Sequence, residues 1–178
     1  MTAIDGWWKR SSKNSGMAEF TRPATWDDLK LVARHLNEAE VEYALIGGYA
    51  IAAHGYNRFS EDLDILVNPS KENARRWISA LAKLPDGATN ELLGQEDLFE
   101  REGPYAVRIN DEFTIDVMPS ACGHPWDELK AYITEVVIDD VRVRVLGIEG
   151  LALTKQGVRD KDRADLQVLR EAIATLKR

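Results

Sequence analysis

Three aspartates in apolar surroundings are the residues of this chain best suited to chemistry. Asp62 and Asp64 are one residue apart in the run Asp-Leu-Asp-Ile-Leu-Val, and Asp116 lies in the apolar segment 113–118. Side chains alternate along a strand, so Asp62 and Asp64 should project from one face while Leu63 packs on the other. Like charges held together in a partly dry site repel each other, which raises one pKa unless a cation lies between them.

The cation that best suits these side chains is magnesium. Mg²⁺ prefers hard oxygen ligands and is usually held by a few carboxylates, water and substrate phosphates. The single cysteine and three scattered histidines do not suggest a zinc site. The alternative is that the aspartates are ordinary strand-edge and turn residues, but acids are depleted from strands and costly when buried unpaired. We therefore expect Asp62, Asp64 and Asp116 to bind two Mg²⁺ ions, with Mn²⁺ as a substitute.

A glycine pair upstream offers a place for phosphate. Residues 43–46 read as a short apolar strand and residues 49–54 as the first turns of a helix, so Gly47 and Gly48 lie at the turn between them. Glycine lets phosphate approach the backbone, and the amides and dipole of a helix start favour an anion. A Gly-Gly turn alone is weak evidence. Together with the Asp-x-Asp run it predicts metal-assisted nucleotidyl transfer.

These residues resemble the signature of the nucleotidyltransferase superfamily typified by DNA polymerase β. That signature is an apolar residue, Gly-Gly or Gly-Ser, a spacer, an acid-apolar-acid run and a later third acid. Within the superfamily, the runs 47–50, 54–58 and 60–64 resemble small bacterial toxins of the AbiEii type, and the likeness extends over residues 41–169. The chain departs from the pattern at Gly48, where many members have serine, and at Ser60, where threonine is common. We expect an altered grip on the nucleotide from these two changes.

The resemblance implies roles and partners. Asp62 and Asp64 would bridge the metal ions, Asp116 would bind one ion and act as general base, and Lys155 would face the nucleotide. The substrate would be a nucleoside triphosphate (NTP), and the acceptor a hydroxyl on RNA or protein. An antitoxin protein would be the partner. Two alternatives stay open: an antibiotic-modifying enzyme with a small-molecule acceptor, and a non-catalytic module that binds a nucleotide or a partner.

Two charged residues outside the signature, Arg58 and Lys155, have two interpretations each. Arg58, in the loop before Asp62, either braces the triphosphate together with Ser60 and the glycines, or pairs with Glu61 or Asp62. Lys155 either offsets triphosphate charge or lies on a solvated helix face. The alternating charges of residues 159–165 predict an exterior position, because such a run is usually exposed.

Composition limits the range of functions. The chain has 178 residues, 44% of them hydrophobic, and a net charge of -7. This length supports one domain. No apolar run approaches the roughly 20 residues needed to span a bilayer, and the N-terminus lacks a secretory signal, so we expect a cytoplasmic protein without membrane contact. General affinity for nucleic acid needs a large basic surface, which the acidic balance argues against.

The order of patterns predicts a mixed α/β (α+β) domain. We expect a flexible N-terminal arm over residues 1–24, carrying the pair Trp7-Trp8, and a single domain over residues 25–178. Its core, residues 41–146, should form a short, mostly antiparallel sheet covered by helices, followed by a C-terminal helical cap over residues 148–177. Hairpins are expected about Asn110-Asp111 and Asp139-Asp140. Residues 88–103 show no clear pattern.

Overall fold

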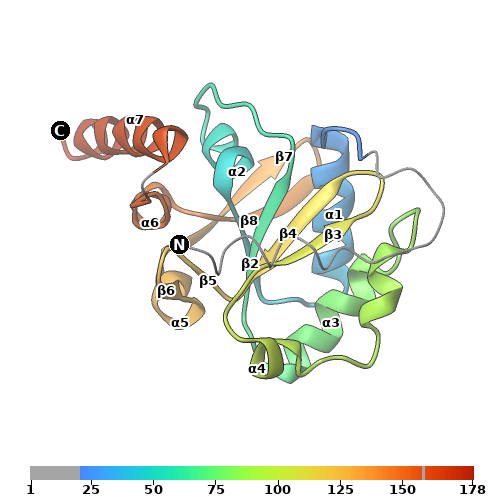
Figure 1. Ribbon diagram of the computed structural model, residues 1–178. Coiled ribbons are helices and arrows are strands. Elements are labelled where there is room, and N and C mark those ends of the chain that lie inside the picture. The colour runs from blue at the N-terminus through green and yellow to red at the C-terminus, as the bar shows by residue number, and fades with distance from the viewer. Residues whose placement is uncertain (1–20, 158) are drawn as a thin grey trace.

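A six-stranded sheet forms the centre of the protein (Figure 1). The computed structural model describes residues 21–157 and 159–178. The α-helices are α1 Trp26–Glu38, α2 Gly47–Ala53, α3 Lys71–Leu81, α4 Leu98–Glu102, α5 Trp126–Leu129, α6 Ile148–Thr154 and α7 Asp160–Leu176. The strands are β1 Tyr43–Ile46, β2 Leu63–Val67, β3 Val107–Asn110, β4 Thr114–Met118, β5 Ser120–Ala121, β6 His124–Pro125, β7 Ile133–Ile138 and β8 Val141–Leu146. Short 3₁₀ helices cover Ala88–Leu92 and Lys130–Tyr132.

The sheet is mixed, with strand order β3-β4-β2-β1-β8-β7. β1 runs antiparallel to β2, and hairpins β3–β4 and β7–β8 form the two edges. Two pairs, β1–β8 and β2–β4, are parallel. This arrangement confirms the expected mixed, mostly antiparallel sheet. It also makes β2 and β4 direct neighbours, so that Asp116 lies beside the strand that carries Asp64.

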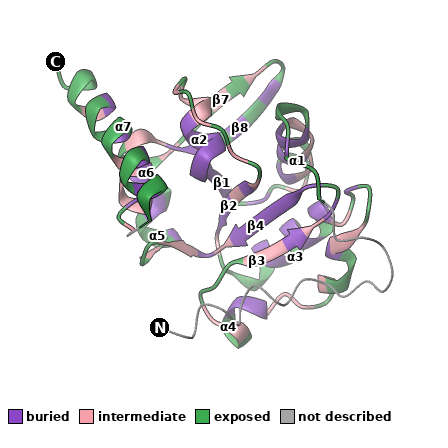
Figure 2. Cartoon of the chain, turned by 45° about the horizontal axis from the view of Figure 1, so that its top comes forward, coloured by how far each residue is buried: buried purple, intermediate pink, exposed green. Residues whose placement is uncertain are grey.

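Helices α1 and α3 cover one face of the sheet. Thr25 and Asp28 form a capping box that fixes the start of α1, and Ser70 caps α3 through the Asn73 amide. Tyr43 of β1 donates a hydrogen bond to Asn37 of α1, so the odd-numbered side chains of β1 point toward this helix. The central strands are buried, whereas the far end of α7 is exposed (Figure 2).

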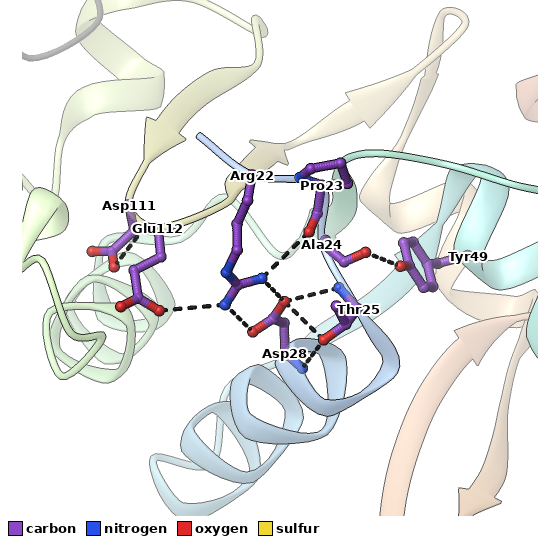
Figure 3. A network of polar contacts seen from close by, with 8 residues as sticks. All are labelled: Arg22, Pro23, Ala24, Thr25, Asp28, Tyr49, Asp111 and Glu112. Carbon is purple, nitrogen blue, oxygen red and sulfur yellow. Dashed lines mark hydrogen bonds and ion pairs between the residues drawn. The ribbon is translucent and has the colours of Figure 1, made fainter. Parts of the chain in front are cut away.

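The segment before α1 is fastened to the sheet (Figure 3). Arg22 donates two hydrogen bonds to Asp28, at 2.5 and 2.9 Å, and one to Glu112 in the β3–β4 turn at 3.3 Å. The Ala24 amide donates to the Glu61 carbonyl at 2.8 Å, directly before Asp62. Residues 21–24 of the expected arm therefore contact the domain. Residues 1–20, including Trp7-Trp8, lie outside the described part of the chain.

Other expected elements are present with adjusted limits. The second hairpin turns at Asp139-Asp140 as expected, and Asp139 adopts a positive φ of 56° there. The segment 88–103, without a clear pattern, holds the first 3₁₀ helix and α4. None of the helices in the described residues is long and apolar enough to span a membrane.

Candidate active site

Strand pairing places the predicted acids in a row across the sheet. Asp64 of β2 pairs with Asp116 of β4 on one side and with Ile46 of β1 on the other. Asp116 in turn pairs with Arg108 of β3. Paired residues project from the same face, so the row lies on the face opposite to α1 and α3. Asp62 lies directly before β2, since the strand begins at Leu63, and not within the strand as expected.

The glycine turn meets this row at Asp64. Gly47 has φ of +71°, a conformation that side chains rarely adopt. A Cβ atom on Gly47 would lie 2.2 Å from Oδ2 of Asp64, so the carboxylate lies directly against the backbone of the turn. The turn predicted to bind phosphate and the carboxylates predicted to bind metal therefore lie side by side.

The two departures from the superfamily pattern are spatially coupled. A Cβ atom on Gly48 would lie 2.7 Å from Cβ of Ser60 and 3.2 Å from its Oγ. Ser60 thus fills the space that a side chain at position 48 would need. Its hydroxyl donates a hydrogen bond to the Asp62 carbonyl at 3.0 Å. The chain keeps a hydroxyl beside the turn, but supplies it from the loop rather than from the turn itself.

Arg108 is a residue of the site that the sequence interpretation missed. Its Nε donates to Oδ1 of Asp116 at 2.9 Å, and one Nη donates to Oδ2 of Asp116 at 2.9 Å. The same Nη contacts Oδ2 of Asp62 at 3.4 Å. A hairpin turning about Asn110-Asp111 would pair Arg108 with Phe113. The observed register pairs it with Asp116, because the turn occupies residues 111–113. A shift by an odd number of residues moves a side chain to the other face.

Burial, together with negative neighbours, raises the pKa values of Asp62 and Asp64. The pKa of Asp64 rises to about 7, first because burial disfavours its charged form and then because Asp116 and Asp62 are negative neighbours. The charge of Lys155 opposes this rise. Burial also raises the pKa of Asp62, while the Arg108 charge works against it. Additional positive charge near Asp62 and Asp64 would therefore stabilise their ionised forms.

The donor set fits a hard divalent cation in its chemistry. Negative neighbours raise the pKa of Asp64, which favours a cation among these carboxylates, and their oxygens are the ligands that Mg²⁺ prefers. As the side chains lie, no group of three His, Cys, Asp or Glu residues within 21–157 and 159–178 is arranged to hold a metal ion. The guanidinium of Arg108 engages both oxygens of Asp116 and one oxygen of Asp62.

A second charged cluster joins the loop before β2 to the C-terminal helices. Arg58 Nε donates to Oδ1 of Asp165 on α7 at 2.8 Å, instead of pairing with Glu61 or Asp62. Lys155, which ends α6, lies 3.1 Å from Oδ2 of Asp165 and 3.5 Å from Oδ1 of Asp162. Oδ2 of Asp165 is buried without an aligned hydrogen-bond donor.

This cluster is buried. Lys155 is 8% exposed, Asp162 3% and Asp165 5%, so the expectation that residues 159–165 are exterior was wrong for both aspartates. The interpretation considered only the alternation of charges. Asp162 and Asp165 are three residues apart, and this spacing places both on one face of α7. Lys155 does not lie on a solvated helix face, and its charge reaches Asp64.

The family model for aminoglycoside-2''-adenylyltransferase matches residues 28–169, which include the whole row and the C-terminal cluster. The chain belongs to this family. Its members are nucleotidyltransferases, and the chain is accordingly a nucleotidyltransferase. The match confirms the superfamily inferred from the glycine turn and the aspartates. No curated sequence matches the chain significantly.

Solved structures with the same fold include an antibiotic-modifying enzyme. The lincosamide antibiotic adenylyltransferase LnuA, in its lincomycin-bound structure, is 15% identical, with a TM-score of 0.50 over 83% of this chain and 98% of that chain. An antigenic nucleotidyltransferase-like protein from Paracoccidioides brasiliensis is 20% identical, with a TM-score of 0.45 over 83% of this chain and 77% of that one. At such identities the likeness to LnuA shows the fold alone.

Proposed function

We propose that this nucleotidyltransferase transfers a nucleoside monophosphate, in the first instance AMP from ATP, to a hydroxyl of a small cationic acceptor. The observation that carries the proposal is the position of Asp64, which lies against the glycine turn at Gly47 and beside Asp116 on the neighbouring strand. An anion at the turn and a reacting hydroxyl near Asp116 would therefore lie at opposite ends of one short row of carboxylates.

The roles of the chain's own residues follow from this geometry. The amides of Gly47 and Gly48 bind phosphate oxygens of the NTP, and the Ser60 hydroxyl lies next to them. Lys155 and Arg58 contribute positive charge on the side of the C-terminal helices. Asp62, Asp64 and Asp116 hold Mg²⁺, which when bound offsets triphosphate charge and lowers the pKa of the acceptor hydroxyl.

Asp116 acts as general base in the transfer step. A carboxylate oxygen of Asp116 takes the proton of the acceptor hydroxyl, and the resulting oxygen attacks the α-phosphorus. A new bond forms between that oxygen and the α-phosphorus, while the bond to the β-phosphate bridging oxygen breaks. The electron pair leaves with pyrophosphate.

Family membership and charge support a small acceptor. The family is named for an aminoglycoside adenylyltransferase, and LnuA, with the same fold, is bound to an antibiotic. A net charge of -7 attracts a cationic small molecule and repels the phosphate backbone of RNA. The expected cytoplasmic location would give the enzyme access to NTPs.

The acceptor class can be tested by following the label. The purified protein is incubated with Mg²⁺ and each α-labelled NTP, together with amino-sugar antibiotics, lincosamides, total RNA or a cell extract. Label on a cationic antibiotic supports the proposal, and label confined to RNA or protein contradicts the small acceptor. The Asp64→Asn variant serves as the inactive control.

A toxin of the AbiEii type is the second candidate. It is favoured by the resemblance of the runs 47–50, 54–58 and 60–64 to those toxins. In this case the acceptor is a hydroxyl on RNA or protein, and an antitoxin restrains the enzyme. Expression of the chain alone would then slow growth, and Asp64→Ala would restore it. Harmless expression at a high level would eliminate this candidate.

A further inference from the structure

A guanidinium group occupies the gap between two carboxylates that the proposed reaction assigns to Mg²⁺. Arg108 makes two 2.9 Å hydrogen bonds to Asp116, one to each oxygen, and a 3.4 Å contact to Asp62. The side chain of Asp116 is only 9% exposed, and Arg108 is the cation paired with it in the row. A paired, fork-like contact of this kind is among the stronger hydrogen-bonded ion pairs.

The guanidinium and a divalent metal ion compete for the same oxygens. Each oxygen of Asp116 has two lone pairs and directs one of them at Arg108, so the positive guanidinium lies beside the oxygens that a metal ion would use. Because two cations repel each other, binding of the metal to Asp116 and Asp62 would favour a movement of the Arg108 side chain.

The position of Arg108 allows this movement without opening the core. β3 is the edge strand of the sheet, next to β4 alone, and the Arg108 side chain is 34% exposed. A long side chain with its stem on an edge strand can turn its charged group toward water. Asp116 lies within β4 and Asp62 directly before β2, and the pairing of these two strands does not involve the Arg108 side chain.

We propose that Arg108 is a positioning residue of this site that acts as an internal cation. In the metal-free protein it holds Asp62 and Asp116 together against their mutual repulsion, and it releases them when the metal enters with the nucleotide. Arg108 therefore lowers the affinity of the free protein for Mg²⁺ and keeps the site folded without it. This proposal rests on the proposed function, which identifies the entering group as Mg²⁺ with an NTP.

The test measures Mg²⁺ affinity of the nucleotide-free protein by calorimetry. Arg108→Ala should bind Mg²⁺ at least about tenfold more tightly than the wild type, with Arg108→Lys between them. Arg75→Ala removes an exposed arginine that pairs with Glu96 away from the site, and it should bind like the wild type. A merely structural arginine predicts the opposite direction, because its loss would loosen the site and weaken Mg²⁺ binding.

A thermal melt gives a second readout that does not depend on activity. In EDTA, Arg108→Ala should melt below the wild type, and Mg²⁺ should raise its midpoint more than that of the wild type. Unchanged or weaker Mg²⁺ binding in both Arg108→Ala and Arg108→Lys overturns the inference, whether or not the enzyme is active. If Asp64→Asn still binds Mg²⁺ and transfers label like the wild type, the proposed function fails instead.

Discussion

Gly47 and Gly48 each make room for one neighbouring side chain. Gly47 admits the Asp64 carboxylate, and Gly48 admits Ser60. The sequence pattern predicted that glycine is needed at this turn for phosphate. The structure adds that the two glycines also allow the acid and the hydroxyl to approach the backbone. Each glycine of the turn is therefore matched in space to one side chain, Asp64 or Ser60.

Gly48→Ala should be costly because of Ser60. The new methyl group would lie 2.7 Å from Cβ of Ser60, so we expect a loss of about 1–3 kcal/mol in the free energy of unfolding and lower transfer activity. Ser60→Gly in the same chain removes the obstructing atom and should recover most of the loss. Urea denaturation of both single variants and the double variant measures the coupling. Costs that simply add in the double variant would disprove the pairing.

Asp64→Asn should stabilise the metal-free protein at high pH. The folded-state pKa of Asp64 is raised to about 7, above its ordinary value of 3.8, so the folded protein binds more protons between these values and loses stability as pH rises. Asparagine does not titrate. The variant should exceed the wild type by up to about 4 kcal/mol at pH 8 in EDTA, and by almost nothing at pH 4. Denaturation curves at both pH values test this, and an equal effect at the two values would contradict it.

At the scale of elements, local signals were predictable and distant ones were not. The capping box at Thr25 and the β7–β8 turn at Asp139-Asp140 depend on neighbouring residues, and both are present. The register of β3 against β4 depends on the length of the turn between them. Asp111 lies in this turn, and its carboxylate accepts hydrogen bonds from the backbone amides of Asp86 and Ala88. That long-range contact has no signature in the sequence, so Arg108 was missed. The aspartates and glycines were found because their spacing is itself the signature.

The Asp165 cluster should hold α7 against the loop before β2. Asp165→Asn leaves Arg58 and Lys155 with a neutral partner in a buried place, so we expect a loss of about 2–4 kcal/mol in the free energy of unfolding. Asp160→Asn changes an exposed aspartate on the same helix and should cost less than about 0.5 kcal/mol. Chemical denaturation compares the two. Equal stability of both variants would show that the cluster does not stabilise the helix.

At the scale of the whole molecule, the sheet brings together residues from distant parts of the chain. β1 delivers the glycine turn, and the parallel pair of β2 and β4 places Asp64 beside Asp116, 52 residues later in the sequence. On the opposite face, α1 and α3 complete the core. The fold class and the placement of Asp116 beside the strand of Asp64 could be inferred from the sequence, whereas the C-terminal cluster required the packing of α7 to be known.

The most direct test of the account follows the α-phosphate of an NTP. With Mg²⁺ and an acceptor, the wild type should transfer label from α-labelled but not γ-labelled ATP, and EDTA should stop the transfer. Asp62→Ala and Asp64→Asn should lose at least about a thousandfold in rate, roughly 4 kcal/mol of transition-state stabilisation, while keeping a cooperative melt. Transfer at the wild-type rate by either variant, or transfer that persists in EDTA, would contradict the assignment of these aspartates to a metal-assisted nucleotidyl transfer.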